Sequence, residues 1–294
     1  MSVLVASSLD EALAHLAAAP AALVLAGGTD LMVELNGGHR RAGDVVCVNR
    51  VAELRTWRHD PEAGTLRIGA AVTYAELGTE PLASLAPALA QAARTVGSPQ
   101  IRNAATIGGN LGTASPAGDG LPVLAALDAV VHLASATGGE RDVPFAEFAT
   151  GPKRTVVRAG ELITGVTVPV LSGFQGYRKV GVRNAMVIAT ASACLAVHMP
   201  ARSVRIALGS VGPVILRSPE AEAIAANEVN WSAEPVAVSA STVARFAAAA
   251  AATARPIDDH RSSAAYRRRA IEVLAGRLLT QAFAGRTNGE AGTA

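Results

Sequence analysis

Two segments with paired glycines constrain the fold of this chain more than any other feature of its sequence. The first is Ala26-Gly27-Gly28-Thr29-Asp30, and the second is Thr106-Ile107-Gly108-Gly109-Asn110. Glycine accepts a positive φ and lets backbone N–H groups approach a phosphate, while Thr and Asn side chains add hydrogen bonds. The pair predicts two loops around the two phosphates of a dinucleotide, although either segment alone is more often only a tight turn.

The spacing of the glycines argues against two common nucleotide-binding folds. The run Gly108-Gly109-Asn110-Leu111-Gly112 does not match the G-x-G-x-x-G fingerprint, and no G-x-x-x-x-G-K-[ST] phosphate loop occurs in the sequence. A Rossmann NAD domain and an ATPase are therefore disfavoured.

Length and composition favour two domains built from small apolar side chains. The chain has 294 residues, of which 50% are hydrophobic and only 3% aromatic, so Leu, Val, Ile and Ala must fill its core. The 26 basic and 24 acidic residues give a formal net charge of +2, which argues against a nucleic-acid partner. The basic run at 267–269 is more typical of a solvated face or a contact with a partner subunit.

Neither a membrane span nor a metal site is expected. The apolar stretch from Met186 to Val197 is shorter than the roughly 18 residues of a membrane helix, and Arg245 interrupts the Ala-rich segment near the C-terminus. The N-terminus lacks the basic region of a secretory signal, which predicts a cytoplasmic protein. Cys47 and Cys194 lack C-x-x-C spacing and no histidines pair at i, i+4, so we expect two buried thiols and no metal.

Residues 1–170 carry the alternating helix and strand signals of an α+β domain. Ser8 can cap a helix in which Leu9, Leu13 and Leu16 recur at helical spacing, and Pro20 ends it. Further elements expected in a first subdomain, residues 1–52, are a strand at 22–26, a helix at 30–35 and a strand at 45–48.

A second subdomain, residues 53–170, is expected to open with a β-hairpin. Segments 54–59 and 65–69 flank a turn that contains Pro61 and Gly64. Thr73 and Glu76 then have the spacing of a capping box, which predicts the start of a helix. Further expected elements are a helix at 87–96 and strands at 129–134 and 162–168.

A linker at 171–173 leads into a second, smaller domain, residues 171–284. Expected strands at 176–179, 188–197 and 203–211 precede expected helices at 239–254 and 262–282. Residues 285–294 are small and polar, which predicts a flexible tail.

Both glycine segments take part in a resemblance to a known family. The stretch 24–31, together with 106–119, resembles the paired flavin-binding motifs of the molybdenum hydroxylases, the xanthine dehydrogenase and carbon monoxide dehydrogenase family. This combination is far more specific than either glycine pair. The resemblance continues through 97–103, 151–155, 161–163, 177–180, 183–185, 258–262 and 266–269. It covers the chain to about residue 282.

The resemblance implies an α+β fold class and an FAD cofactor. A two-subdomain FAD-binding domain of the molybdopterin dehydrogenase, vanillyl-alcohol-oxidase-like type would precede a smaller α+β domain with an antiparallel sheet and C-terminal helices. FAD would lie in a cleft, with residues 26–30 and 106–110 around its diphosphate and Asp119 holding its nucleotide part. The implied FAD contacts are Leu25, Ala26, Gly27, Gly28, Thr29, Asp30, Leu31, Val96, Thr106, Ile107, Gly108, Gly109, Asn110, Ser115, Asp119, Ile163 and Lys179.

Three of these implied contacts rest on single positions matched in relatives. Ile163 and Lys179 match positions that contact the cofactor in relatives, but Arg178 beside Lys179 could take its role. A cation near the flavin would favour its anionic reduced form. Val96 stands where some relatives have an aromatic residue that packs on the ring, and a valine cannot stack.

The implied function is that of an FAD-carrying oxidoreductase subunit with no catalytic residue of its own. A large partner subunit would hold a molybdopterin-type molybdenum cofactor and a small one 2Fe-2S clusters, as a dimer of heterotrimers, with NAD, oxygen or a quinone as acceptor. The segment 31–41 is closer to xanthine-dehydrogenase-like subunits than to carbon monoxide enzymes. Two alternatives stay open: an assembly or maturation protein that retains the fold, and a stand-alone flavin oxidase.

Overall fold

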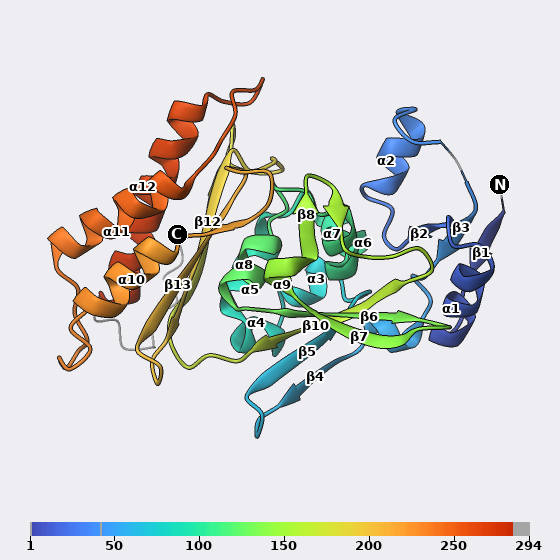
Figure 1. Ribbon diagram of the computed structural model, residues 1–294, viewed down its shortest axis with the longest axis horizontal. Helices are drawn as coiled ribbons and strands as arrows, with labels where there is room; N and C mark the ends of the chain where they lie inside the picture. Colours follow the sequence, from blue (N-terminus) through green and yellow to red (C-terminus); the bar gives the residue numbers. More distant parts are fainter. Residues whose placement is uncertain (1, 42, 285–294) are drawn as a thin grey trace.

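The computed structural model describes residues 2–41 and 43–284, which form three parts side by side in Figure 1. A small sheet with two helices lies at one end, a five-stranded sheet under short helices lies in the middle, and a four-stranded sheet backed by longer helices lies at the other end. Helices and sheets are thus combined as the predicted α+β class requires.

The first part is a three-stranded parallel sheet in the order β1-β3-β2. Its elements are β1 (Val3–Val5), α1 (Leu9–Ala18), β2 (Leu23–Leu25), α2 (Leu31–Asn36) and β3 (Val45–Cys47). Ser8 caps α1 as predicted, because its side chain accepts a hydrogen bond from the backbone N–H of Glu11. The first glycine segment lies between β2 and α2, at the expected junction of strand and helix.

The middle part is an antiparallel sheet in the order β4-β5-β10-β6-β7, with helices over one face (Figure 1). Its elements are β4 (Trp57–Asp60), β5 (Thr65–Gly69), α3 (Tyr74–Leu77), α4 (Leu82–Leu85), α5 (Pro87–Thr95), α6 (Pro99–Ala104), α7 (Ile107–Thr113), α8 (Leu121–Ala126), β6 (Val130–Ser135), β7 (Gly139–Pro144), α9 (Phe145–Phe148), β8 (Ala149–Gly151), β9 (Arg154–Thr155) and β10 (Leu162–Pro169).

The predicted hairpin is confirmed, but its first strand begins later than expected. Residues Ala52–Arg55 form a short 3-10 helix in which Leu54 is buried. The carbonyl of Leu54 accepts a hydrogen bond from Ala71 at 2.7 Å, so these residues turn against the end of β5 and do not extend β4. The predicted capping box is also confirmed, since Thr73 and Glu76 exchange hydrogen bonds at the start of α3.

The last part is a four-stranded antiparallel sheet in the order β11-β12-β13-β14. Its elements are β11 (Gln175–Val180), β12 (Ala191–His198), β13 (Ser203–Gly209), β14 (Leu216–Arg217), α10 (Pro219–Glu228), α11 (Ala240–Thr253) and α12 (Ala264–Ala282). Alternate residues of β12 face opposite sides. Ala193 and Leu195 pack in the core under the three helices, whereas Cys194 and Ala196 belong to the core of the middle part. The two cores therefore share this sheet.

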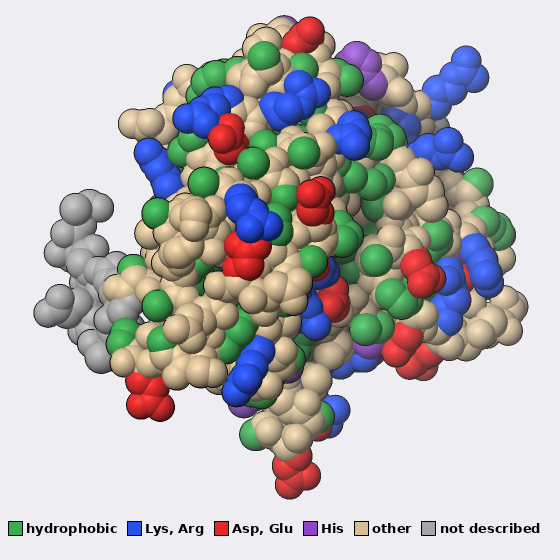
Figure 2. All heavy atoms as spheres, turned by 60° about the vertical axis from the view of Figure 1, so that its left-hand side comes forward, with side chains coloured by type: hydrophobic (Ala, Val, Ile, Leu, Met, Phe, Trp, Pro, Cys, Tyr) green, Lys and Arg blue, Asp and Glu red, His purple; other side chains and the backbone are tan. Residues whose placement is uncertain are grey.

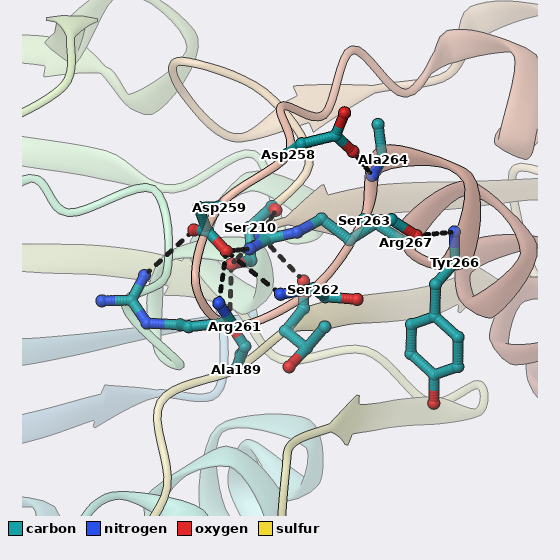
Figure 3. A network of polar contacts seen from close by, with 11 residues as sticks. Ala189, Ser210, Asp258, Asp259, Arg261, Ser262, Ser263, Ala264, Tyr266 and Arg267 are labelled. Atoms are coloured by element: carbon teal, nitrogen blue, oxygen red, sulfur yellow. Dashed lines mark hydrogen bonds and ion pairs between the residues drawn. The ribbon is translucent and has the colours of Figure 1, made fainter.

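A buried arginine fastens the loop between α11 and α12 to the ends of the last sheet (Figure 3). Arg267 donates to Asp259 Oδ1 at 2.6 Å, to the carbonyl of Ser210 at 2.8 Å and to that of Thr190 at 3.1 Å. The backbone N–H of Arg261 and this ion pair lower the pKa of Asp259 to about 2. The first residue of the predicted basic run is therefore internal.

The other residues of that run lie at the surface. Arg268 is exposed, and Arg269 pairs with Glu272 at 2.8 Å. Figure 2 shows basic and acidic side chains interspersed over the face that it presents. In residues 2–41 and 43–284 no helix is long and apolar enough to cross a membrane. The tail predicted at 285–294 lies outside the described residues.

Candidate functional site

A cleft of about 660 Å³ lies where the three parts of the molecule meet, and both glycine segments line it. Strand β10 and residues 186–188 of the last part contribute further walls. The predicted contacts that line the cleft are Ala26, Gly27, Gly28, Thr29, Asp30, Leu31, Val96, Thr106, Gly108, Gly109, Asn110, Ser115, Asp119 and Ile163. Segments far apart in sequence are thus brought together in one place.

The other three predicted contacts do not line the cleft. Leu25 belongs to β2, Ile107 is fully buried in α7, and Lys179 makes an ion pair with Asp119 behind the cleft wall. Arg178, the alternative to Lys179, donates to Gln281 of α12. Successive side chains of a strand point to opposite faces, so Arg178 lies on the side of β11 away from the cleft.

Each glycine pair contains one residue that packs against the protein's own backbone. A Cβ on Gly27 would lie 1.8 Å from the carbonyl oxygen of Ala104, and a Cβ on Gly108 would lie 2.6 Å from the Cβ of Ala70. Gly28, at φ +73°, and Gly109 have more room, since a Cβ on either would meet its nearest atom at 3.1 Å. One glycine of each pair permits close packing, and the other keeps the cleft wall free of a side chain.

The two glycine segments differ in their backbone donors. Within residues 2–41 and 43–284, no group accepts a hydrogen bond from the N–H groups of residues 27–30. In the second segment, the N–H groups of Ile107 and Gly108 donate to the carbonyls of Val72 and Ala70, and that of Gly109 donates to Thr106 Oγ1. Only the first segment therefore offers a row of available backbone donors to an anion.

Polar side chains of the second segment are held in fixed orientations. The hydroxyl of Tyr74 donates to Asn110 Oδ1 at 2.6 Å, which leaves the amide NH2 of Asn110 for other partners. Thr113, the last residue of α7, donates to Asp30 Oδ2 at 3.2 Å and so links that helix to the first segment. Sequence reasoning did not assign a role to Tyr74, because nothing in its local pattern indicates a contact 36 residues away.

The helix after the first glycine segment is held mainly by charges. Helix α2 has no buried residue. Glu34 in α2 accepts a hydrogen bond from Lys153, in the β8–β9 turn, at 2.5 Å, and Arg40 lies 3.7 Å from the same carboxylate. The contact with Lys153 is the main reason that the pKa of Glu34 is lowered. An exposed ion pair thus closes one rim of the cleft.

Asp119 forms a buried polar cluster with two residues of β11. Its Oδ1 accepts from the hydroxyl of Tyr177 at 2.7 Å, and its Oδ2 accepts from Lys179 Nζ at 2.7 Å. Burial raises the pKa of Asp119, whereas Lys179 and Tyr177 act in the opposite direction. Each carboxylate oxygen of Asp119 accepts one of these two bonds, which leaves lone pairs to accept from a ligand hydroxyl.

The two ends of the cleft are apolar but differ in exposure. At one end lie Leu16 and Val48, which are buried. At the other lie Ile101, Met186 and Ile188, which are 37%, 55% and 53% exposed. The sequence pattern predicted Ile188 as part of a strand, yet β12 begins only at Ala191, so reasoning from periodicity missed this wall.

Comparison with known proteins now identifies the fold. A model of the FAD binding domain in molybdopterin dehydrogenase matches residues 1–171, and a model of the CO dehydrogenase flavoprotein C-terminal domain matches residues 176–282. The chain belongs to the molybdopterin dehydrogenase flavoprotein family. The resemblance stated from its motifs is thereby confirmed, as are the two-domain FAD-binding fold, the oxidoreductase class and FAD as the family's cofactor.

Individual relatives of this flavoprotein match it over most of its length. The glyceraldehyde dehydrogenase medium chain of Sulfolobus acidocaldarius is 33% identical, with 92% of this chain and 93% of the relative covered. A putative xanthine dehydrogenase FAD-binding subunit of Escherichia coli is 33% identical, with 76% and 78% covered. The crystal structure of quinoline 2-oxidoreductase from Pseudomonas putida 86 contains a chain with a TM-score of 0.88 at 26% identity, and 97% of both chains is covered.

The cleft suits the cofactor of this family. Its volume of about 660 Å³ falls within the ~300–1,000 Å³ typical of cofactor pockets. Four successive available N–H groups at residues 27–30 match the negative oxygens of a diphosphate. Apolar residues of the first part and of the last part also line the cleft, and the ring systems of a dinucleotide need such surfaces.

Proposed function

We propose that this chain is the FAD-carrying electron-transfer subunit of a heteromeric molybdenum hydroxylase. The observation that carries the proposal is the row of available N–H groups at residues 27–30, in a cleft that apolar residues of the first part and of the last part also line. A diphosphate with a ring system on both sides needs that arrangement. When bound, FAD would supply the capacity to accept electrons from one partner and to donate them to another.

The residues of the chain divide the work of holding FAD. The backbone at 27–30 would bind the diphosphate, and Asn110 and Ser115 would donate to the phosphates or to the ribityl chain that follows them. Asp119 would accept from a hydroxyl of the cofactor. Gly109 would leave the space through which the diphosphate passes. Ala26, Leu31, Thr106 and Ile163 would complete the walls.

The difference in exposure between the two groups of apolar residues supports one placement of the two rings. The end formed by Leu16 and Val48 is buried and suits the adenine, which takes no part in electron transfer. The end formed by Ile101, Met186 and Ile188 is open to solvent and suits the flavin ring, which must come close to a redox partner. Val96 lies at this end and would contact the ring without stacking on it.

The proposed partners are a large subunit with a molybdopterin-type cofactor and a small subunit with 2Fe-2S clusters. The names of the relatives support this, since both glyceraldehyde dehydrogenase and carbon monoxide dehydrogenase contain a medium chain similar to this one. The proposed assembly is a dimer of heterotrimers, the proposed acceptor is NAD, oxygen or a quinone, and the cytoplasm is the proposed compartment. A xanthine-type substrate stays a prediction, because relatives of equal identity act on other compounds.

A visible absorption spectrum of the purified chain tests the proposal, with acid release to tell FAD from FMN or covalent flavin. We expect a yellow protein that releases FAD and that is reduced only when the molybdenum and iron-sulfur partners and their substrate are added. Reduction by a small substrate without partners would favour the stand-alone oxidase. A folded protein that takes up no FAD, even with its partners, would overturn the proposal in favour of the assembly protein.

A further inference from the structure

The ammonium group of Lys179 joins three segments around the exposed end of the cleft. Its Nζ donates to Asp119 Oδ2 at 2.7 Å, to the carbonyl of Thr95 at 2.8 Å and to the carbonyl of Val187 at 3.0 Å. An ammonium group has three protons, so all of its donors are used inside the protein. The side chain is only 9% exposed and does not line the cleft.

Two of the carbonyls that accept these hydrogen bonds, those of Thr95 and Val187, are next in sequence to residues of the cleft wall. Thr95 is the last residue of α5, where carbonyls lack partners within the helix, and Val96 follows it directly in the wall. Val187 lies between Met186 and Ile188, which also line the cleft. Lys179 therefore holds two stretches of backbone whose neighbours form the apolar surface at this end.

The position of segment 181–188 depends strongly on Lys179. Within residues 2–41 and 43–284, the hydrogen bond from Lys179 to Val187 is the one hydrogen bond that links this segment to the rest of the chain. The side chain of Arg183 donates to the carbonyls of Ala185 and Met186, but these bonds lie inside the segment. Lys179 also pairs with Asp119 at 2.7 Å in this buried place, and hydrogen bonds within an ion pair are stronger than those between neutral groups.

We propose that Lys179 is a positioning residue: it sets where Val96 and residues 186–188 lie on the wall that receives the flavin ring, and it does not contact the ring. This inference rests on the proposed function, because the place of the ring follows from FAD binding. The lysine acts through two backbone carbonyls. Its effect on the flavin is therefore an effect on the shape of the wall.

Proteolysis of the chain without added FAD tests the first step. Arg183 is exposed within the segment that Lys179 ties down, so an arginine-specific protease reports on release of that segment. We expect Lys179→Met to raise the rate of cleavage after Arg183 by about tenfold, the usual effect of losing one hydrogen bond from a charged donor. Arg178→Met is the matched control, since Arg178 lies on the other face of β11, and it should leave this rate unchanged.

The flavin spectrum tests the second step in a way that a purely structural role would not. With FAD bound to saturation, we expect Lys179→Met to shift the visible absorption bands and the fluorescence of the flavin, while Arg178→Met leaves both as in the parent. A spectrum and a cleavage rate equal to those of the parent in a folded Lys179→Met chain would overturn the inference.

A second pair of variants covers the case in which Lys179→Met does not fold because Asp119 is left unpaired. Asp119→Asn keeps Lys179 and its two carbonyl bonds, whereas the double variant Asp119→Asn with Lys179→Met removes those bonds and the buried charge together. The inference predicts fast cleavage after Arg183 only in the double variant, and equal rates in the two would refute it. A parent chain that binds no FAD would refute the proposed function instead. The cleavage rates would still test whether Lys179 holds segment 181–188 in place.

Discussion

The two glycine segments share a sequence pattern, but the protein supports them in opposite ways. The second lies at the start of α7, whose Ile107, Gly108 and Leu111 are buried, and most of its N–H groups donate inside the protein. The first precedes α2, which has no buried residue, and the N–H groups at 27–30 have no acceptor within the described ranges. The second segment is packed into the core and forms a fixed part of the cleft wall. The first is a loop held by polar contacts, with N–H groups available to an anion.

The difference shows what a glycine motif does and does not specify. A pair of glycines permits close approach of backbone, but what approaches depends on the rest of the fold. Behind Gly108 the carbonyl of Ala70 takes the N–H group, whereas the first segment has no such partner. We therefore expect changes in the second segment to affect folding most strongly and changes around the first to affect retention of FAD.

The largest effect is expected from Gly108→Ala. The new Cβ would lie 2.6 Å from Ala70 Cβ and 2.7 Å from its carbonyl oxygen, in the core of the middle part. Overpacking of this kind should lower the free energy of unfolding by about 3 kcal/mol, measured by urea denaturation. Gly109→Ala is the matched control, because its Cβ meets only Thr106 Oγ1 at 3.1 Å, and equal losses for both would remove the distinction between the two glycines.

Gly109→Val should come next, with its effect on FAD and not on folding. A branched side chain at this position would occupy the space proposed for the diphosphate, so we expect the affinity for FAD to fall about 50-fold, equivalent to ~2.3 kcal/mol of steric conflict. Titration of the flavin-free chain with FAD, followed by fluorescence quenching, measures the affinity. Undiminished FAD content in a variant of parental stability would contradict the placement of Gly109.

A smaller effect distinguishes the caps of the two helices. Thr106 caps α7 through a hydrogen bond from Gly109, whereas Asp30, at the same position of α2, makes no cap bond. Thr106→Ala should lower the free energy of unfolding by about 1 kcal/mol, and Asp30→Ala should change it by less than ~0.5 kcal/mol. Thermal unfolding of the two variants compares them. A greater loss for Asp30→Ala would show that α2 contributes more to folding than its exposure suggests.

The smallest effect concerns the ion pair that closes the rim. Glu34→Gln should speed the release of FAD about twofold at neutral pH, because an exposed ion pair contributes less than ~1 kcal/mol. Lys153 lowers the pKa of Glu34 below 4.5, so the contribution of the pair is fully present above pH 4.5 and is lost as the pH falls below it. Release of FAD from the parent should therefore accelerate in acid towards the rate of the variant, and stopped-flow fluorescence measures both rates.

Local signals in the sequence predicted much of the fold. The predicted caps at Ser8 and Thr73 start helices α1 and α3, because a cap depends on residues three positions apart. The hairpin of β4 and β5 and the strands of the last sheet follow from turns and apolar runs that lie side by side in sequence. Family resemblance then identified the cofactor, and most of the contacts that it implied line the cleft.

Long-range contacts explain what the sequence did not reveal. The N–H groups of the second glycine segment are used by carbonyls more than 30 positions away, and the burial of Arg267 depends on strands β12 and β13. The apolar character of Ile188 predicted a strand, but it lies in the cleft wall, next to the carbonyl of Val187 that accepts from Lys179. The local sequence around a residue does not indicate which distant residue it will contact.

The sheet shared by the two cores has a consequence for how the chain is made. Tyr177, Cys194 and Ala196 fill part of the middle core, and the helices α5 and α8 pack against β11, β12 and β13. During synthesis the N-terminal two thirds leave the ribosome first, and the apolar surfaces of α5 and α8 stay uncovered until β13 has emerged. We therefore expect a chain truncated at residue 171 to aggregate, although it contains both glycine segments.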